Sequence, residues 1–192
     1  FLVELLRHLK KGSPAQETLS EIHNTSELEQ MLLRDDIDLA LVEGDISSPY
    51  LLSSPFMVDE LVIVVPPDCP LAQRAPLSVQ ELRSLTMYLR EEGSGTRDLF
   101  LHTIAQHHTA VHIAGSFNNT EALKKVVIAG LGATILSRRL VADDIAAGTL
   151  VPLAVDHVTF NRIFKIVHHK DKFITPPLQA VIQACQQHDQ WF

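Results

Sequence analysis

The chain has 192 residues, a length that either one large domain or two small ones can fill. Its composition, 46% hydrophobic and 20% charged, is that of an ordinary globular protein able to bury a proper core. Sixteen Lys and Arg against 23 Asp and Glu give a formal net charge of -7, which argues against a nucleic-acid-binding protein, because such proteins generally carry a basic face or stripe.

The chain opens on a predicted helix. Leucines repeat at helical spacing from Leu2 to Leu9, and Gly12 and Pro14 are typical residues for the end of such a helix. Phe1 enters the pattern with no Ser, Thr, Asp or Asn before it to cap the helix. We therefore expect the natural protein to extend upstream.

A strand–helix–strand unit is predicted next. Residues 18–23 alternate in polarity, as in a half-buried strand, and Thr25 or Ser26 can cap the helix that follows. The apolar run at 38–42 predicts a second strand, paired in parallel with the first.

The rest of the chain predicts a second α/β lobe. Residues 60–65 form the strongest predicted strand and run into a proline-rich segment at 66–70, which we interpret as a lobe boundary. Beyond it, predicted helices at 78–85, 96–107, 120–129 and 138–147 alternate with predicted strands at 87–89, 111–114 and 133–136, followed by a returning strand at 162–168 and a last helix at 176–187. The sequence thus predicts two Rossmann-like α/β lobes joined by two crossover strands, lobe I being 1–65 with 167–192 and lobe II being 66–166.

The most informative stretch is residues 89–97, which follows a predicted strand and opens a predicted helix. Glycines allow the backbone to turn with positive φ, and the amides of a helix start, together with the hydroxyls of Ser94 and Thr96, can hold a small anion. An ordinary capped loop explains the same residues equally well. A P-loop is excluded, because no GK[ST] follows a first glycine at the required spacing.

The run GSGTR at 93–97 resembles the signature of LysR-type effector-binding (substrate-binding) domains. Other stretches resemble the family in the same order, and together they cover almost the whole chain: DLALVEG at 38–44, DELVIVVPP at 59–67, PLA at 70–72, EALKKVV at 121–127, GLGATILS at 130–137 and GTL at 148–150. This resemblance implies a type 2 periplasmic-binding-protein-like fold that holds an effector in the cleft between its lobes. It also implies an N-terminal winged helix-turn-helix that is absent from this chain, and pairing of the domains as a homodimer, with a tetramer possible for the full-length protein.

The resemblance further implies that the ligand meets hydroxyls and amides at helix starts. The family's first strand and the Ser/Thr-bearing turn after it should lie upstream of Phe1, which would leave the first-lobe half of the site incomplete. The positions of this sequence that match the family's ligand-binding positions are Ser94, Gly95, Thr96, Asn118, Asn119 and Thr120, with Gly44, Ser137 and Thr175 as weaker candidates at strand ends.

Three arginines could clamp an anion, because the guanidinium fork suits oxyanions. We favour a structural role for Arg97, which would tie the loop to Glu91, Glu92 or another acidic side chain. Arg138 and Arg139 are open to both interpretations, as an anion clamp or as a solvated helix start, and we expect at least one to be solvated.

Neither a metal site nor a catalytic centre is predicted. The clustered His107, His108 and His112 lack the HExxH spacing, and the adjacent His168 and His169 would point to opposite faces of a strand. No Ser/His/Asp set, carboxylate pair or activated cysteine has a recognisable catalytic setting. Cys69 and Cys185, far apart and without CxxC spacing, predict free thiols. We expect no enzymatic activity, no metal and no cofactor.

The leading hypothesis is an effector-sensing and oligomerisation domain of a DNA-binding regulator. No run approaches the roughly 18 apolar residues of a membrane span, and the start of the chain is unlike a secretory signal, so we expect a cytoplasmic location and no membrane partner. The expected ligand is an inorganic oxyanion or a small carboxylate, and DNA would be bound only through the missing N-terminal domain. The alternative is a transport solute-binding protein of the same fold, which an upstream signal peptide would reveal; an enzyme on this frame would need a catalytic constellation that we do not find.

Overall fold

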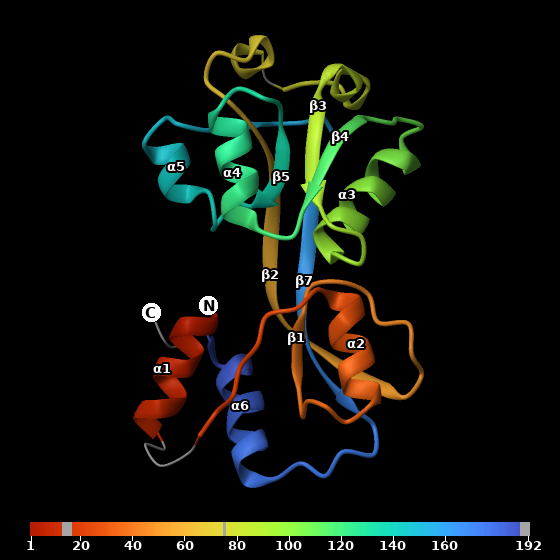
Figure 1. Ribbon diagram of the computed structural model, residues 1–192, viewed down its shortest axis with the longest axis vertical. Coiled ribbons are helices and arrows are strands. Elements are labelled where there is room, and N and C mark those ends of the chain that lie inside the picture. Colours follow the sequence, from red (N-terminus) through yellow and green to blue (C-terminus); the bar gives the residue numbers. More distant parts are fainter. Residues whose placement is uncertain (13–16, 75, 189–192) are drawn as a thin grey trace. The chain divides into compact units, whose positions relative to one another are not determined.

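The computed structural model describes residues 1–12, 17–74, 76–188 and divides the chain into two compact units (Figure 1). Unit 1 comprises residues 1–57 and 163–192, and unit 2 comprises residues 58–162. The chain passes between them within two strands, β2 (Leu51–Val65) and β7 (Phe160–His169). The chain therefore leaves unit 1 after residue 57 and returns to it at residue 163, inside these two strands. Both boundaries lie earlier in the chain than the predicted lobe boundaries, after residues 65 and 166.

Unit 1 has a three-layer arrangement. Its helices are α1 (Leu2–Gly12), α2 (Thr25–Leu33) and α6 (Pro176–Gln186), and β1 (Ala40–Val42) pairs antiparallel with β7. Alternate residues in and just before β1 pack to opposite sides: Ala40 and Val42 join a cluster with Leu32 of α2, while Leu39 and Leu41 pack with residues of α1 and α6. Figure 1 shows α2 on one side of β1 and β7 and the pair α1 and α6 on the other.

Three expectations for unit 1 need correction or qualification. The strand predicted over 18–23 is wrong: these residues are extended but belong to no strand, and Leu19 and Ile22 are 90% and 86% exposed. Alternating polarity makes a strand only where a neighbour satisfies its backbone groups, and here the strand at 40–42 pairs with β7 and not with 18–23. The cap of α2 is Asn24, not Thr25 or Ser26. The first helix ends at Gly12 as predicted, whereas Pro14 lies outside the described residues.

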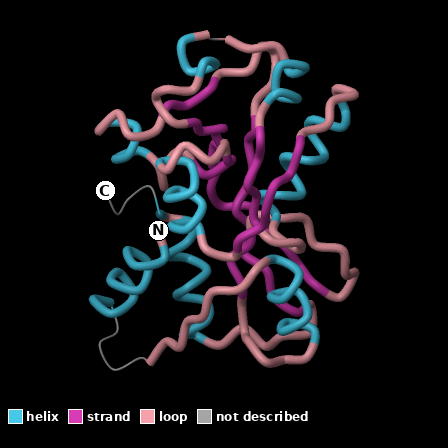
Figure 2. Tube along the Cα trace, turned by 45° about the horizontal axis from the view of Figure 1, so that its top comes forward, coloured by secondary structure: helices cyan, strands magenta, loops and turns pink. Residues whose placement is uncertain are grey.

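Unit 2 is built around the second half of β2. Its other strands are β3 (Thr86–Arg90), β4 (His112–Phe117), β5 (Thr134–Ser137) and β6 (Val151–Leu153); its helices are α3 (Gly95–Gln106), α4 (Thr120–Ile128), the short α5 (Ala142–Ala146) and two 3-10 turns at Pro70–Gln73 and Val79–Ser84. Strands β5 and β6 pair antiparallel with β2, and β3 pairs in parallel with β4. In both ribbon and tube views, the strands of unit 2 lie between its helices (Figures 1 and 2).

Strand β2 is buried on both faces inside unit 2. Leu61, Ile63 and Val65 pack in the cluster that contains Phe100 and Ile104 of α3, whereas Val62 and Val64 pack with Leu123 and Val127 of α4. The continuous apolar run of the sequence thus corresponds to a strand covered by helices on both sides. The helix predicted over 138–147 is too long, because residues 138–140 form a turn and α5 begins only at Ala142.

Gly132 lies where the approach to β5 meets β3. The amide of Ala133 donates to the carbonyl oxygen of Thr86, and the amide of Tyr88 donates to the carbonyl oxygen of Ala133, both at 2.8 Å. A Cβ atom at position 132 would collide with that Thr86 oxygen, a backbone atom that cannot move away cheaply. A glycine is therefore required for the two segments to bond this closely.

We expect Gly132→Ala to lower the free energy of unfolding by about 1–3 kcal/mol, the usual cost of overpacking. Gly12→Ala is the control, because a Cβ there meets no atom within 4 Å, and it should change stability by less than about 0.5 kcal/mol. Urea-induced unfolding followed by circular dichroism measures both. Equal stability of the two variants would show that the close approach at Gly132 is not required.

Candidate functional site

The start of α3 carries a buried hydroxyl with no partner. Ser94 is the N-cap of this 12-residue helix and is 2% exposed, yet its side chain makes no capping hydrogen bond. Within the described part of the chain, its Oγ has no hydrogen-bond partner at all. Leaving such a group unsatisfied costs about 1–3 kcal/mol, so a partner from outside the chain, a ligand or a water molecule, is expected there.

The other long helices with a described N-cap close their own starts. Asn24 accepts from the amide of Glu27 at α2, Asn119 accepts from the amides of Glu121 and Ala122 at α4, and Thr175 accepts from the amide of Leu178 at α6. Serine is as good a capping residue as these, but Ser94 does not turn its oxygen to its own helix. The start of α3 therefore differs from the others in being left open to an external acceptor.

Two residues after Ser94, the helix is tied to a buried ion pair. Arg162 of β7 donates from Nη1 to Oγ1 of Thr96 at 2.7 Å, while its Nε and Nη2 lie 2.8 Å from Oδ2 of Asp59 on β2. The side chains of Asp59 and Arg162 are 1% and 7% exposed. Ser137, the last residue of β5, donates from Oγ to Oδ1 of Asp59 at 2.8 Å. Four side chains thus form one chain of hydrogen bonds, and it contains the predicted residues Thr96 and Ser137.

Asp59 and Arg162 were not predicted from the sequence, although the position of each along its strand indicates a buried charge. Asp59 has the same phase along β2 as the buried Leu61 and Ile63, and Arg162 has the same phase along β7 as the buried Phe160. A charged residue in phase with core residues needs a buried counter-charge. The sequence could have marked both positions in this way, but it could not pair residues 103 positions apart.

The second predicted helix start, at residues 118–120, is arranged differently. Oδ1 of Asn119 lies 2.8 Å and 3.2 Å from the amides of Glu121 and Ala122, so these donors are already used. Asn118 and Asn119 are exposed and Thr120 is half-buried. Of the residues predicted in unit 2, Thr96 and Ser137 contact the ion pair, Ser94 and Gly95 directly precede Thr96 in the chain, and Asn119 has a capping role.

The two candidates in unit 1 have local roles. The carbonyl oxygen of Gly44 accepts from Nζ of Lys165 at 3.4 Å, and a Cβ at Gly44 would press on the side chain of Thr25. Thr175 is exposed and accepts from the amide of Leu178.

The arginines near the site are held by protein groups. Arg97 donates to the carbonyl oxygen of Arg90 at 3.1 Å, so it has the predicted structural role, but its partner is a backbone oxygen and not the acidic side chain that the sequence predicts. Arg138 forms a two-bond ion pair with Glu60, and both side chains are about half exposed. Arg139 is 61% exposed, which confirms that at least one of this pair is solvated, and its Nε lies 4.0 Å from Oδ1 of Asp59, at the edge of the buried ion pair.

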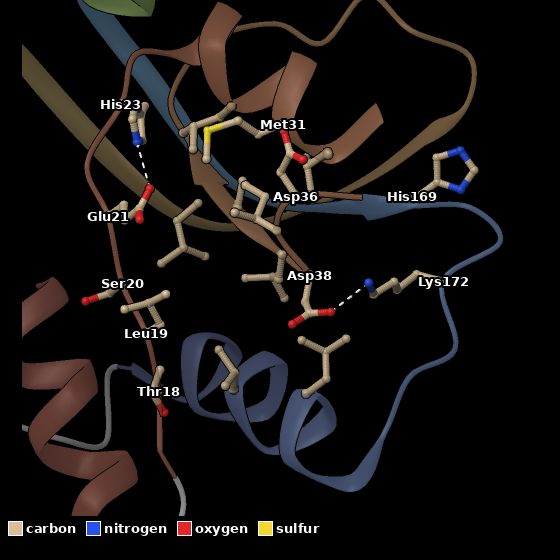
Figure 3. Close-up of a pocket in the computed structure, with 18 of the residues that line it drawn as sticks. Thr18, Leu19, Ser20, Glu21, His23, Met31, Asp36, Asp38, His169 and Lys172 are labelled. Carbon is tan, nitrogen blue, oxygen red and sulfur yellow. Dashed lines mark hydrogen bonds and ion pairs between the residues drawn. The ribbon is translucent and has the colours of Figure 1, made fainter. Parts of the chain in front are cut away.

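Unit 1 contains a separate groove of about 1530 Å³ with mainly apolar walls (Figure 3). In Figure 3 the extended segment that carries Leu19 and Glu21 lies along one side of it, and β1 lies opposite. Lys172 contacts Asp35 and Asp38 at 2.6 Å each, and these hydrogen bonds raise the pKa of Lys172 above its ordinary value. Among the predicted ligand-binding residues, Thr175 alone lines this groove, so its apolar surface is not the predicted anion site.

The described ranges also bear on metal ligation, membrane spanning and cysteine reactivity. These ranges hold no cluster of three or more His, Cys, Asp and Glu side chains that could bind a metal ion, and no helix within them has the length and apolar character needed to cross a bilayer. Cys185 is buried, and this burial raises the pKa of its thiol to about 12, which keeps it protonated and a poor nucleophile. Cys69, also a free thiol, is partly buried.

Comparison with known proteins gives consistent matches over most of the chain. The family model described as LysR substrate binding domain matches residues 1–190. The uncharacterized HTH-type transcriptional regulator YeiE of Escherichia coli K12 is 34% identical over 164 residues, which are 85% of this chain and 56% of that protein. HTH-type transcriptional regulator CysL of Bacillus subtilis is 29% identical over 183 residues, covering 91% of this chain and 61% of CysL. This chain therefore spans little more than half the length of these relatives.

Solved structures show the same fold at low sequence identity. The CcmR regulatory domain of Synechocystis PCC6803, solved in complex with 2-PG, has a TM-score of 0.90 at 22% identity, covering 98% of this chain and 90% of that one. The effector-binding domain of QuiR in complex with shikimate has a TM-score of 0.85 at 20% identity, with the same coverage.

We expect Asp59→Ala to lower the free energy of unfolding by about 3–5 kcal/mol, because the buried guanidinium of Arg162 loses the carboxylate that it pairs with. The next residue supplies the control. Glu60→Ala removes an exposed partner of Arg138 and should cost less than about 1 kcal/mol. Urea denaturation of both variants checks this difference, and similar losses would mean that the Asp59–Arg162 pair contributes no more than a surface contact.

Proposed function

This chain belongs to the LysR substrate-binding-domain family, and from that premise we propose that it senses a small oxyanion-bearing effector at the start of α3. Its fold is the periplasmic-binding-protein-like fold of LysR effector-binding domains. The family is one of transcriptional regulators, which favours the regulatory interpretation over a transport solute-binding protein.

The unpaired hydroxyl of Ser94 is the observation that carries this proposal. A ligand oxyanion at the start of α3 would accept the Ser94 hydrogen and would lie at the positive end of the helix dipole. The residues around it are held rigidly, since Thr96 is bonded to Arg162, and Ser137 to Asp59. A preorganised polar site gains affinity because little has to be ordered when the ligand binds.

Effector binding would act on the regulator through this domain. We infer that the longer protein binds DNA through a segment outside this chain, because the chain has a net charge of -7 and spans only 56% of YeiE. We further propose that the domain works as a homodimer in the cytoplasm and catalyses no reaction. A ligand that favours one arrangement of such a dimer would shift the population of the DNA-binding state.

We expect at least one of sulfate, phosphate, 2-PG and shikimate to raise the melting temperature of the chain. A ligand present at about 100 times its Kd adds about 2.7 kcal/mol to the free energy of unfolding. For a chain of this length, that gain raises the melting temperature by about 5–11 °C. Ser94→Ala should remove this shift, because it deletes the unpaired hydroxyl.

Thr134→Val is the matched control. Thr134 also has a buried hydroxyl with no partner among the described residues, but it lies in β5 and not at a helix start. Its valine variant should respond to the probe as the parent does. An unchanged shift in Ser94→Ala, or no shift with any of the four probes, would contradict the proposed site.

A further inference from the structure

The side chains of the Asp59–Arg162 ion pair are almost fully buried. Each of them also contacts a predicted ligand-binding residue: Asp59 contacts Ser137, and Arg162 contacts Thr96. We propose that this pair is a positioning element of the effector site, which holds Thr96 in the first turn of α3 and sets the hydrogen-bond polarity of Ser137. The inference rests on the proposed function and adds two residues, Asp59 and Arg162, that act through their neighbours.

The polarity of Ser137 follows from the chemistry of its partner. A carboxylate only accepts hydrogen bonds, so Ser137 must give its one hydroxyl hydrogen to Oδ1 of Asp59, 2.8 Å away. Its oxygen then presents lone pairs only. Ser137 can accept a hydrogen bond from a ligand O–H or N–H, but it cannot donate one to an oxyanion.

The other end of the pair fixes Thr96. A guanidinium only donates, so Oγ1 of Thr96 is the acceptor in its 2.7 Å contact with Nη1 of Arg162. Arg162 also donates from Nε to Oδ2 of Asp59 and has Nη2 2.8 Å from the same oxygen, which holds the guanidinium in a buried position. The first turn of α3, and with it Ser94, is thereby held against β7.

These polarities restrict what each hydroxyl can do with a ligand. Ser94 can donate its hydrogen to an oxyanion at the start of α3, whereas Ser137 can only accept from a ligand group that reaches it. The pair also lies close to both points where the chain leaves unit 2, since Arg162 is the last residue of that unit and Asp59 the second. A ligand that pulls on Thr96 or Ser137 therefore acts directly on the two crossover strands.

The first variant replaces both members of the ion pair at once, so that neither charge is left buried without a partner. Asp59→Leu/Arg162→Met substitutes apolar side chains of similar size, a change that buried ion pairs often tolerate. Arg162→Lys is the second variant, which keeps the charge but lacks the fork that reaches both Asp59 and Thr96. Lys124→Met/Asp144→Leu is the control, because it removes a partly buried ion pair of the same unit that contacts none of the proposed ligand-binding residues.

Amide hydrogen exchange of the ligand-free chain is the first measurement. In either pair variant, exchange at residues 95–99 should become about tenfold faster than in the parent, because the first turn of α3 has lost its anchor, while α4 stays unchanged. The control should exchange like the parent at residues 95–99. Parent-like exchange of this turn in Arg162→Lys, or in a folded double variant, would overturn the inference.

Affinity for the probe that gives the largest thermal shift is the second measurement. We expect each pair variant to lose about tenfold or more in affinity and the control to lose none. Faster exchange with unchanged affinity would show that the pair supports the fold and does not position the site, which also overturns the inference. If no probe binds the parent, the proposed function fails, and the exchange experiment alone decides whether the pair anchors α3.

Discussion

The charge of Arg162 cannot be buried alone, and the arrangement of unit 2 around its crossover strands follows from this constraint. Removing a guanidinium from water costs several kcal/mol, which only a close counter-charge and further hydrogen bonds can offset. Asp59 supplies the counter-charge from β2, and Thr96 accepts one of the remaining donors. Because Asp59 also needs partners for its second oxygen, Ser137 of β5 is drawn into the same network. One ion pair thus joins β2, β7, the end of β5 and the start of α3.

The proposed site lies beside this network because, among the long helices whose N-cap is described, α3 is the one whose capping side chain makes no hydrogen bond to its own helix. Helices α2, α4 and α6 are closed by Asn24, Asn119 and Thr175, so their starts offer an anion fewer free donors. At α3 the capping residue is buried and the next turn is anchored to Arg162. The helix start combines an unmet hydrogen-bonding need with a fixed geometry, which is what a selective small-molecule site requires.

Local signals in the sequence predicted much of this structure. The helical spacing of α3 and α4 and the GSGTR turn come from residues close together in the chain, and each was placed correctly to within a few residues. The buried strand predicted over 60–65 is the second part of β2, which begins much earlier, at Leu51. The errors concern partners. Residues 18–23 have the alternation of a strand but no neighbour to pair with, and 138–140 form a turn although the pattern suggested helix. Ser94 and Thr96 could be named as candidates because they stand beside glycines in a recognisable turn, whereas the pairing of Asp59 with Arg162 depends on a contact between distant strands.

The account depends on the claim that Ser94 is left unbonded by the chain because an effector completes it. The crystal structure of this chain with its strongest-binding probe tests this most directly. We expect an oxyanion of the ligand within about 2.7–3.1 Å of Ser94 Oγ and of the first amides of α3, with the Asp59–Arg162 pair intact. A ligand bound in the apolar groove of unit 1, with Ser94 still lacking a partner, would contradict it.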